Sequence, residues 1–530
     1  MREDEARDKR AHRGPIFLEI EDKMYHPEPR EFERLCREGN LIPVYREILA
    51  DLETPVSAFI KLHLEKEDSM GKWEDYTYLL ESVERGERLG RYSFIGIDPF
   101  MIFQSKGKRA YLSSSTGNTE VYEVDDDPLF ILKKIMHRFK VVNLPYLPIF
   151  FGGAVGYVGY DVIKFWEKKV PSLNKEDSGF PDLFFIFTRN IVIFDHLDHR
   201  IKIISFAFLN GESPEKIYRR TKDRIEKIVS RLRCKLPQVQ KVKNVKRKKE
   251  KVKSNFAQED FIKAVKKAKE YIRDGDIFQV VLSQRFAREI YSSPFDIYRV
   301  LRSLNPSPYM YFLKFDDFSI VGSSPEILVR KEGEDVILRP IAGTRPRGRS
   351  EKEDVKLAEE LITDEKERAE HIMLVDLGRN DLGRVCKYGT VEVKELFSLE
   401  RYSHVMHLVS EVRGKLRKGL DQFDLLRACF PAGTVSGAPK VRAMQIIEEL
   451  EPSLRGPYAG ALGYFSFSGN MDTCIIIRTM IIQDNTAYIQ AGAGIVADSI
   501  PENEFKETQN KARALVTAIE LAEEGTEWLW

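Results

Sequence analysis

A basic run between Lys241 and Lys253, with eight basic residues and one glutamate, divides the chain into two parts with different hydrophobic patterns. Before it, short apolar stretches alternate with turn residues, which is typical of strands: Ile201–Phe208 predicts one strand and Phe184–Phe194 a pair of strands. After it, apolar residues recur at helical spacing from Phe261 to Ile272, and strand-like stretches follow. The change predicts two α+β parts that meet near residue 250.

The second part alternates repeatedly between the two patterns. Helical spacing predicts helices at Lys352–Leu361, Glu365–Asp376, Asp421–Cys429, Lys440–Leu450 and Glu502–Glu523. Apolar runs predict strands at Ile277–Phe286, Phe318–Val321, Val336–Leu338, Ala459–Phe467, Thr473–Ile482 and Thr486–Ala491. We therefore expect an extension (1–40), an N-terminal domain (41–240), a solvated basic linker (241–254) and a second domain (255–530).

Composition excludes several classes of protein. The 530 residues are 42% hydrophobic and 32% charged, and a formal net charge of +1 argues against bulk binding of nucleic acid or an anionic membrane. No apolar run approaches the ~20 residues that a membrane span needs, and the charged first residues do not form a secretory signal. Five scattered cysteines without a C-x-x-C pair favour neither a disulfide framework nor a zinc site. These features predict a cytoplasmic protein.

Two glycine-rich stretches only partly match known cofactor loops. Gly433–Lys440 is similar to a Walker A loop, but Val441 stands where a hydroxyl should bind magnesium. Gly492–Ala497 matches G-x-G-x-x-A, yet no βαβ unit can follow it before the chain ends. A dinucleotide-dependent oxidoreductase therefore stays a secondary hypothesis, whereas glycine amides that approach a carboxylate fit the second stretch.

Charged side chains and glycines gather where strands of the second part are expected to end. Arg339–Gly348 holds three arginines and a Gly-Thr turn, and Arg478 follows another predicted strand. Arginines and glycine amides suit a small substrate with several carboxylates. Carboxylates without histidine or cysteine, such as Glu370 and Glu507, suit magnesium.

Taken together, these stretches resemble a known family. From Leu41 to Ala514 the chain is similar to anthranilate synthase component I, within the chorismate-utilising enzymes. The resemblance rests on Tyr78–Ser82, Phe151–Tyr157, Asp276–Val280, Pro308–Met310, Pro340–Pro346, Ala369–Asp376, Val405–Leu408, Phe430–Lys440 and Arg455–Tyr458. It implies an α+β fold with large, mostly antiparallel sheets packed with helices.

The resemblance also implies a magnesium-dependent carbon–oxygen lyase that converts chorismate and ammonia to anthranilate and pyruvate in tryptophan biosynthesis. By the same analogy, Glu370 and Glu507 bind magnesium, Glu326 is the general acid and His407 the base that removes the C2 proton. The implied chorismate-binding residues are Gly343, Thr344, Tyr458, Arg478, Gly492, Ala493 and Gly494.

Two positions separate this activity from its sister activities. Ala342 stands where some aminodeoxychorismate synthases carry a nucleophilic lysine, and Gln279 stands where isochorismate and salicylate synthases carry a lysine base. Glutamine cannot deprotonate water but leaves room for a neutral amine, so both residues favour anthranilate. Aminodeoxychorismate synthase component I is the alternative, and a catalytically silent chorismate- or tryptophan-binding regulator is a further one.

The resemblance finally implies regulation and a partner. Ser82, Pro308, Tyr309 and Met310 match the family's tryptophan site, which predicts feedback inhibition by L-tryptophan. The chain contains no Gly-x-Cys-x-Gly turn of a glutamine amidotransferase. We therefore expect ammonia from a separate glutaminase subunit, component II, in a heterotetramer.

Overall fold

The computed structural model describes residues 24–63, 73, 76–82, 90–173, 179–236, 251–401 and 405–525. Residues 1–23 of the predicted extension (1–40) and residues 241–250 of the predicted linker (241–254) lie outside these ranges. Within them, the strands form one 23-stranded sheet system in which the named strands pair antiparallel, with helices on its outer faces. The predicted α+β class with mostly antiparallel sheets is confirmed.

The first half contributes long strands and a few helices. Its strands are β1 (Tyr25–His26), β2 (Leu41–Leu49), β3 (Thr77–Glu81), β4 (Tyr92–Lys106), β5 (Arg109–Ser114), β6 (Thr119–Glu123), β7 (Gly153–Val158), β8 (Leu183–Asp195) and β9 (Arg200–Phe208). Its helices are α3 (Pro29–Leu35), α4 (Pro55–His63), α5 (Pro128–Met136), η2 (Tyr160–Val162), α6 (Ile163–Trp166) and α7 (Pro214–Leu232).

The second half alternates strands and helices. Its strands are β10 (Lys253–Ser254), β11 (Gln279–Glu289), β12 (Tyr309–Lys314), β13 (Phe318–Ser324), β14 (Ile327–Glu332), β15 (Asp335–Leu338), β16 (Ile341–Pro346), β17 (Glu392–Arg401), β18 (Val405–Lys415), β19 (Gly437–Ala438), β20 (Ala461–Ser466), β21 (Met471–Ile475), β22 (Thr479–Gln483) and β23 (Thr486–Ile495). Its helices are α8 (Gln258–Arg273), α9 (Pro294–Leu304), α10 (Glu351–Thr363), α11 (Glu365–Gly383), α12 (Gln422–Cys429), α13 (Gly433–Ser436), α14 (Lys440–Leu450) and α15 (Pro501–Glu523).

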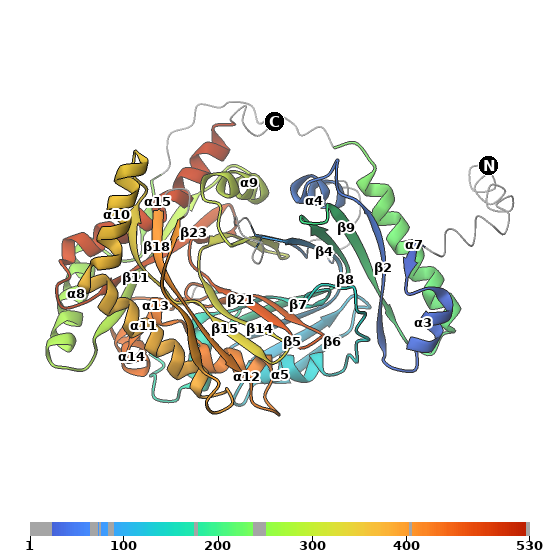
Figure 1. Ribbon diagram of the computed structural model, residues 1–530, viewed down its shortest axis with the longest axis horizontal. Coiled ribbons are helices and arrows are strands. Elements are labelled where there is room, and N and C mark those ends of the chain that lie inside the picture. The colour runs from blue at the N-terminus through green and yellow to red at the C-terminus, as the bar shows by residue number, and fades with distance from the viewer. Residues whose placement is uncertain are drawn as a thin grey trace.

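Two strand pairs join the halves. β3 pairs with β12, where Leu80 lies opposite Tyr311, and β7 pairs with β20, where Tyr157 lies opposite Leu462. Side chains from both halves share one core, in which Tyr157 and Tyr311 are among the largest fully buried residues. Figure 1 shows the strands between helices α10, α11 and α15 on one side and α3 and α7 on the other. The two halves are therefore continuous in sheet and core.

Two strand predictions were wrong. Phe184–Phe194 is part of one strand, β8, which pairs along its length with β4. Its other edge pairs with β7 over residues 183–187 and with β9 over residues 190–195. Its residues are apolar on both faces because both faces are buried, so the alternation that separates one strand from two is missing. Thr473–Ile482 is not one strand, because Arg478 has φ 51° and separates β21 from β22.

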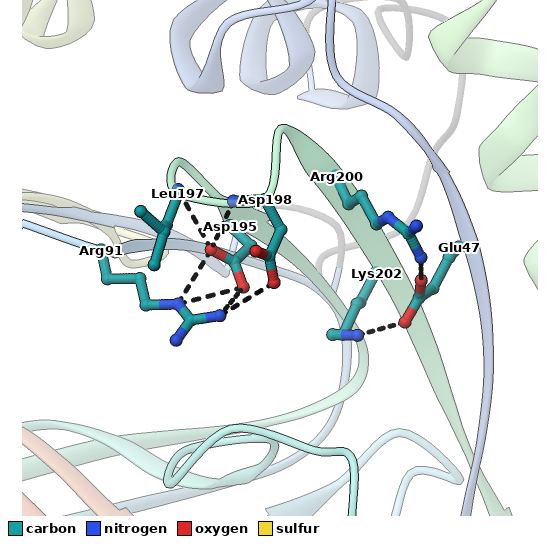
Figure 2. Close-up of polar contacts among 7 residues, drawn as sticks. All are labelled: Glu47, Arg91, Asp195, Leu197, Asp198, Arg200 and Lys202. Carbon is teal, nitrogen blue, oxygen red and sulfur yellow. Dashed lines mark hydrogen bonds and ion pairs between the residues drawn. The ribbon is translucent and has the colours of Figure 1, made fainter.

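Ion pairs connect β2 to β9, and a carboxylate stabilises the turn between β8 and β9. Glu47 lies directly opposite Lys202 in the β2–β9 register and forms ion pairs with Lys202 and Arg200. At the β8–β9 turn, Asp195 accepts hydrogen bonds from two backbone amides of the turn and from the Arg91 guanidinium. Figure 2 shows these two groups side by side on the hairpin. Opposite charges across a strand pair stabilise its register.

The first turns of the two helices that carry the predicted metal ligands have residues that favour a helix start. The Asp364 carboxylate accepts hydrogen bonds from the amides of Lys366 and Glu367, each at 3.0 Å, and so begins α11. Pro501 occupies the first turn of α15, where its fixed φ favours helix and its missing N–H costs nothing. Contacts with β16 and β23, respectively, hold the two helices against the sheet.

Candidate active site

The predicted acid, Glu326, lies in the turn between β13 and β14. Its Oε2 accepts a hydrogen bond of 2.8 Å from the Thr434 hydroxyl. Burial raises the pKa of the Glu326 carboxyl, although Thr434, Lys511 and Arg478 partly oppose this shift. A carboxyl whose pKa is raised retains its proton closer to neutral pH and can donate it to a leaving group.

The predicted base, His407, lies on β18 opposite Thr344 of β16, beside a register shift between Ala342 and Thr344. Its Nδ1 is 3.2 Å from the Gly343 carbonyl oxygen and 2.9 Å from the Thr344 hydroxyl. A carbonyl can only accept, so Nδ1 carries the proton and Nε2 the lone pair. Burial lowers the pKa of His407, which favours the neutral form that a base needs. Gly343 has φ +79°, a conformation that favours glycine.

Glu370 and Gln279 form the next part of the site. Gln279 begins β11, and its Nε2 donates a hydrogen bond of 2.9 Å to Glu370 Oε1 on α11. Gln279 is 6% exposed, and its Oε1 is buried with no hydrogen-bond partner among the described residues. Burial raises the pKa of the Glu370 carboxyl, and the nearby carboxylates of Glu367 and Glu507 raise it further.

Two cationic side chains, Arg478 and Lys511, lie near Glu326. Arg478 adopts φ 51°, and its Nη1 donates to the Lys511 carbonyl at 2.7 Å. Burial lowers the pKa of Arg478, while Glu326, Tyr458 and Glu507 raise it. A non-glycine residue in the left-handed region costs of order 1–3 kcal/mol and persists where surrounding contacts impose it. Burial raises the pKa of Tyr458 to about 12, so its hydroxyl stays protonated.

Small residues of β23 line the space between these groups. A Cβ at Gly492 would lie 2.9 Å from the Tyr458 hydroxyl oxygen, and one at Gly494 would lie 2.7 Å from Gln279 Nε2. Ala493, between them, points into the core and is fully buried. The glycines therefore provide room beside Tyr458 and Gln279 that no other residue type would leave.

Comparisons with known proteins show which family the chain belongs to. The family model for chorismate binding enzymes matches residues 76–517. The chain belongs to the chorismate binding enzymes. It is 51% identical to anthranilate synthase component 1 of Acetivibrio thermocellus, covering 94% of this chain and 100% of that protein. It is 50% identical to the Aquifex aeolicus (strain VF5) protein of the same name, covering 94% and 98%.

Two solved structures share the fold. Anthranilate synthase component I from Streptococcus pneumoniae TIGR4 superposes with a TM-score of 0.72 at 39% identity, covering 88% of this chain and 99% of that one. MenF, the menaquinone-specific isochorismate synthase from Escherichia coli, has a TM-score of 0.66 at 20% identity, covering 92% and 98%. The second likeness concerns the fold alone.

The donor set of the predicted metal ligands fits magnesium in a chorismate binding enzyme. Among the described residues, no group of three or more His, Cys, Asp and Glu side chains is arranged to hold a metal ion. Glu370 and Glu507 are nonetheless near enough for their charges to interact, and a divalent cation would relieve that repulsion. Magnesium in proteins is commonly bound by one or two carboxylates, with water and substrate completing its shell.

Two residues of the site escaped the sequence analysis. Lys511 Nζ donates to the Gly492 carbonyl at 2.9 Å and pairs with Glu507 at 2.7 Å. Its position four residues after Glu507 on a helix is a signal that could have found it. Thr434 belongs to the phosphate-loop lookalike Gly433–Lys440 and to the resembling stretch Phe430–Lys440, but no local pattern connects it to Glu326.

The two cofactor-loop lookalikes have other roles. Lys440 Nζ pairs with Asp381 at 2.7 Å and donates to the Cys429 carbonyl at 3.2 Å, which ties α14 to α11 rather than binding a phosphate. Gly492 and Gly494 lie inside β23, paired with β11, and not in a strand-to-helix turn. A dinucleotide fold therefore does not form around these glycines.

The predicted tryptophan residues lie where the two halves meet. Glu81 of β3 is opposite Met310 of β12, and Ser82 follows directly. The Ser82 hydroxyl is buried and has no hydrogen-bond partner within the described ranges. Pro308 is buried, and the Tyr309 hydroxyl donates to Asp472 Oδ1 at 2.9 Å. All four lie at one end of the β3–β12 pair. β13, which pairs with β12, ends at Ser324, two residues before Glu326.

No helix of the described residues combines the length and apolarity that crossing a membrane requires.

Proposed function

We propose that this chain is the aminase subunit of an anthranilate synthase, which converts chorismate and ammonia to anthranilate and pyruvate with magnesium. The observation that carries the proposal is the Gln279 amide at the centre of the site. Its Nε2 orients Glu370, and its buried Oε1 lacks a donor among the described residues. An orphan acceptor in this position suits an N–H of neutral ammonia, whereas an amide cannot deprotonate water.

Substrate binding follows from the charges of the site. Arg478 and the amides of Gly492 and Gly494 neutralise the enolpyruvyl carboxylate, and the Gly343–Thr344 turn holds the opposite end of the ring. Glu370 and Glu507 would hold magnesium, which when bound withdraws charge toward the ring carboxylate. Tyr458 keeps its proton and can donate a hydrogen bond to an anionic substrate.

The chemical steps use Glu326, whose pKa is raised as an acid requires, and His407, whose pKa is lowered as a base requires. Glu326 donates its proton to the C4 hydroxyl, which leaves as water while ammonia adds at C2. His407, neutral and with its lone pair on Nε2, then removes the C2 proton. The C3–O bond breaks, and the enolpyruvyl group leaves as enolpyruvate, which takes up a proton to become pyruvate. The ring becomes aromatic, which makes this step irreversible in practice.

The alternative is aminodeoxychorismate synthase component I, in which the amine ends at C4. Ala342 lies opposite Leu408 in the β16–β18 pair and offers no nucleophile. This chain therefore lacks the covalent route to aminodeoxychorismate that a lysine at position 342 would provide, so anthranilate is the favoured product.

The same proposal includes inhibition by L-tryptophan at Ser82 and Pro308–Met310. The buried Ser82 hydroxyl, which has no hydrogen-bond partner in the part of the chain that the structure describes, supports a polar ligand there. Ammonia would come from a separate glutaminase subunit, and the pair would assemble as a heterotetramer in the cytoplasm.

Product identification tests the proposal. The purified chain is incubated with chorismate, magnesium and ammonium at alkaline pH, and products are separated by chromatography with and without a chelator. Anthranilate that disappears with the chelator supports the proposal. Aminodeoxychorismate would select the alternative, isochorismate would show that Gln279 does not exclude water, and unchanged chorismate would favour a silent regulator.

A further inference from the structure

The hydroxyl of Thr434 makes the one side-chain hydrogen bond that the described residues provide to the Glu326 carboxyl. Thr434 lies in α13, a single turn between α12 and α14, and donates to Oε2 at 2.8 Å. Thr434 is half-buried, and Val435 and Ser436 beside it are buried. The contact joins segments 108 residues apart, so it depends on how the tertiary structure holds this turn.

A buried ion pair holds the turn in place. Arg455 Nη1 donates to the Val435 carbonyl at 2.7 Å, and Nη2 donates to the Val281 carbonyl of β11 at 2.8 Å. Its partner Glu451 also accepts hydrogen bonds from the Ser283 amide and hydroxyl. The side chains of Arg455 and Glu451 are 1% and 3% exposed. Buried and multiply bonded groups of this kind fix geometry because any displacement leaves a charge unpaired.

We propose that Thr434 is a positioning residue for the acid step: its hydroxyl occupies Oε2 of Glu326, so that Oε1 carries the proton that is transferred. This inference rests on the proposed function. A neutral carboxyl has one accepting and one donating oxygen, and a donor at Oε2 selects Oε1 for the proton.

The hydrogen bond also gains strength during the step. The Oε1–H bond breaks as the proton moves to the C4 hydroxyl oxygen, and the C4–O bond breaks with its electron pair leaving on water. Glu326 becomes a carboxylate, so the Thr434 donor then serves a charged acceptor. An interaction that is stronger in the transition state than in the ground state accelerates the reaction.

Several charged and titratable groups face Glu326 and set its proton affinity together with Thr434. They are Arg478 after β21, Lys511 on α15, Tyr458 before β20, and Arg339 and Asp381, which line a cavity of about 50 Å³ that Glu326 and Thr434 also line. Removing the Thr434 donor leaves the others in place and disfavours the carboxylate, so the proton is retained to higher pH. A collapse of the local structure that admits water would act in the opposite direction, because it would reduce the desolvation of the carboxyl.

The size of the cavity beside Glu326 and Thr434 determines which substitution of Thr434 is informative. The cavity is large enough for a water molecule, which needs about 10–15 Å³ and could replace a lost hydroxyl in an alanine variant. Thr434→Val keeps the shape and opens no additional room for water beside Glu326 Oε2, whereas Thr434→Ser keeps the donor. Ser436→Ala is the matched control, since the Ser436 hydroxyl lies in the same turn but donates to the Ala432 carbonyl at 2.8 Å.

The experiment measures kcat and KM for anthranilate formation against pH at a fixed concentration of free ammonia. For Thr434→Val we expect kcat to fall about 10- to 100-fold, with KM for chorismate nearly unchanged. We also expect the alkaline limb of the pH profile of kcat to move to higher pH. Thr434→Ser should restore both, and Ser436→Ala should leave the limb in place.

Three results would overturn the inference: an unchanged limb in Thr434→Val, a limb that moves to lower pH, or a serine variant as impaired as valine. If Thr434→Val does not fold, Thr434→Ser and Ser436→Ala still test the inference. Thr434→Ser should then have the kcat and the pH profile of the wild type. An inactive wild-type chain would instead contradict the proposed function.

Discussion

Tyr309 lies directly opposite Ser324 in the antiparallel register of β12 and β13, and Glu326 follows Ser324 by two residues. The Ser324 hydroxyl donates to the Ile475 carbonyl at 2.7 Å, and the Ile475 amide donates to the Glu326 carbonyl at 3.0 Å. A ligand that displaces Tyr309 would therefore act on the strand that ends at the proposed acid. This short route is the physical basis that we propose for inhibition by tryptophan.

Replacing Ser82 with alanine should weaken tryptophan inhibition and leave catalysis intact. The Ser82 hydroxyl is buried without a described partner, so a ligand hydrogen bond is the interaction removed. We expect the inhibitory concentration of L-tryptophan to rise roughly 5- to 10-fold, as for the loss of one hydrogen bond, with kcat unchanged. Ser292→Ala removes another buried, unpartnered hydroxyl, in the segment between β11 and α9, and should not alter inhibition. Equal inhibition of Ser82→Ala and wild type would contradict the regulatory site.

Gly494→Ala should disable the site through Gln279. The added Cβ would lie 2.7 Å from Gln279 Nε2, so the amide must move away from Glu370. Displacements of this size cost up to about 100-fold in rate, and we expect kcat/KM to fall at least about 10-fold. Gly383→Ala, which has nothing within 4 Å of its Cβ, is the control and should keep full activity. Steady-state kinetics on both variants check the prediction, and an active Gly494→Ala enzyme would refute the tight packing at this glycine.

The acid limb of kcat should reflect His407. The base must be neutral, so activity falls as pH decreases through its pKa, and burial lowers that pKa below the usual value of about 6.5. We therefore expect the midpoint of the acid limb below pH 6.5 when free ammonia is held constant. His407→Asn should lower kcat by about 100-fold or more and remove this limb. A limb at or above pH 6.5 in the wild type would show that another group titrates.

The carboxylates on α11 and α15 should determine the magnesium requirement. Glu370→Gln and Glu507→Gln each remove one charged oxygen ligand, so the apparent magnesium affinity should fall at least about 10-fold, measured from the magnesium dependence of the rate. Glu502→Gln changes an exposed glutamate of the first turn of α15 and serves as the control. Magnesium dependence that is unaltered in Glu507→Gln would remove this residue from the metal site.

The sequence predicts candidate site residues in a fixed order along the chain. The structure brings some of them into contact from different elements, as where Gln279 at the start of β11 donates to Glu370 on α11. What the sequence missed depends on tertiary contacts. Arg478 interrupts an apolar run that predicts one strand, and its left-handed backbone is imposed by neighbours that no local pattern contains. Thr434 meets Glu326 across 108 residues of chain, a pairing to which neither residue's own neighbourhood points. Both faces of β8 are buried, so its sequence does not alternate between apolar and polar residues, and the length of the strand could not be predicted from such an alternation.

The most direct test of the central claim follows the nitrogen atom. The purified chain, with no glutaminase added, is given chorismate, magnesium and nitrogen-15 ammonium, and the product is examined by mass spectrometry. The account predicts anthranilate that carries the heavy nitrogen, formed by wild type and lost in Glu326→Gln. A product without nitrogen, or aminodeoxychorismate in place of anthranilate, would contradict it.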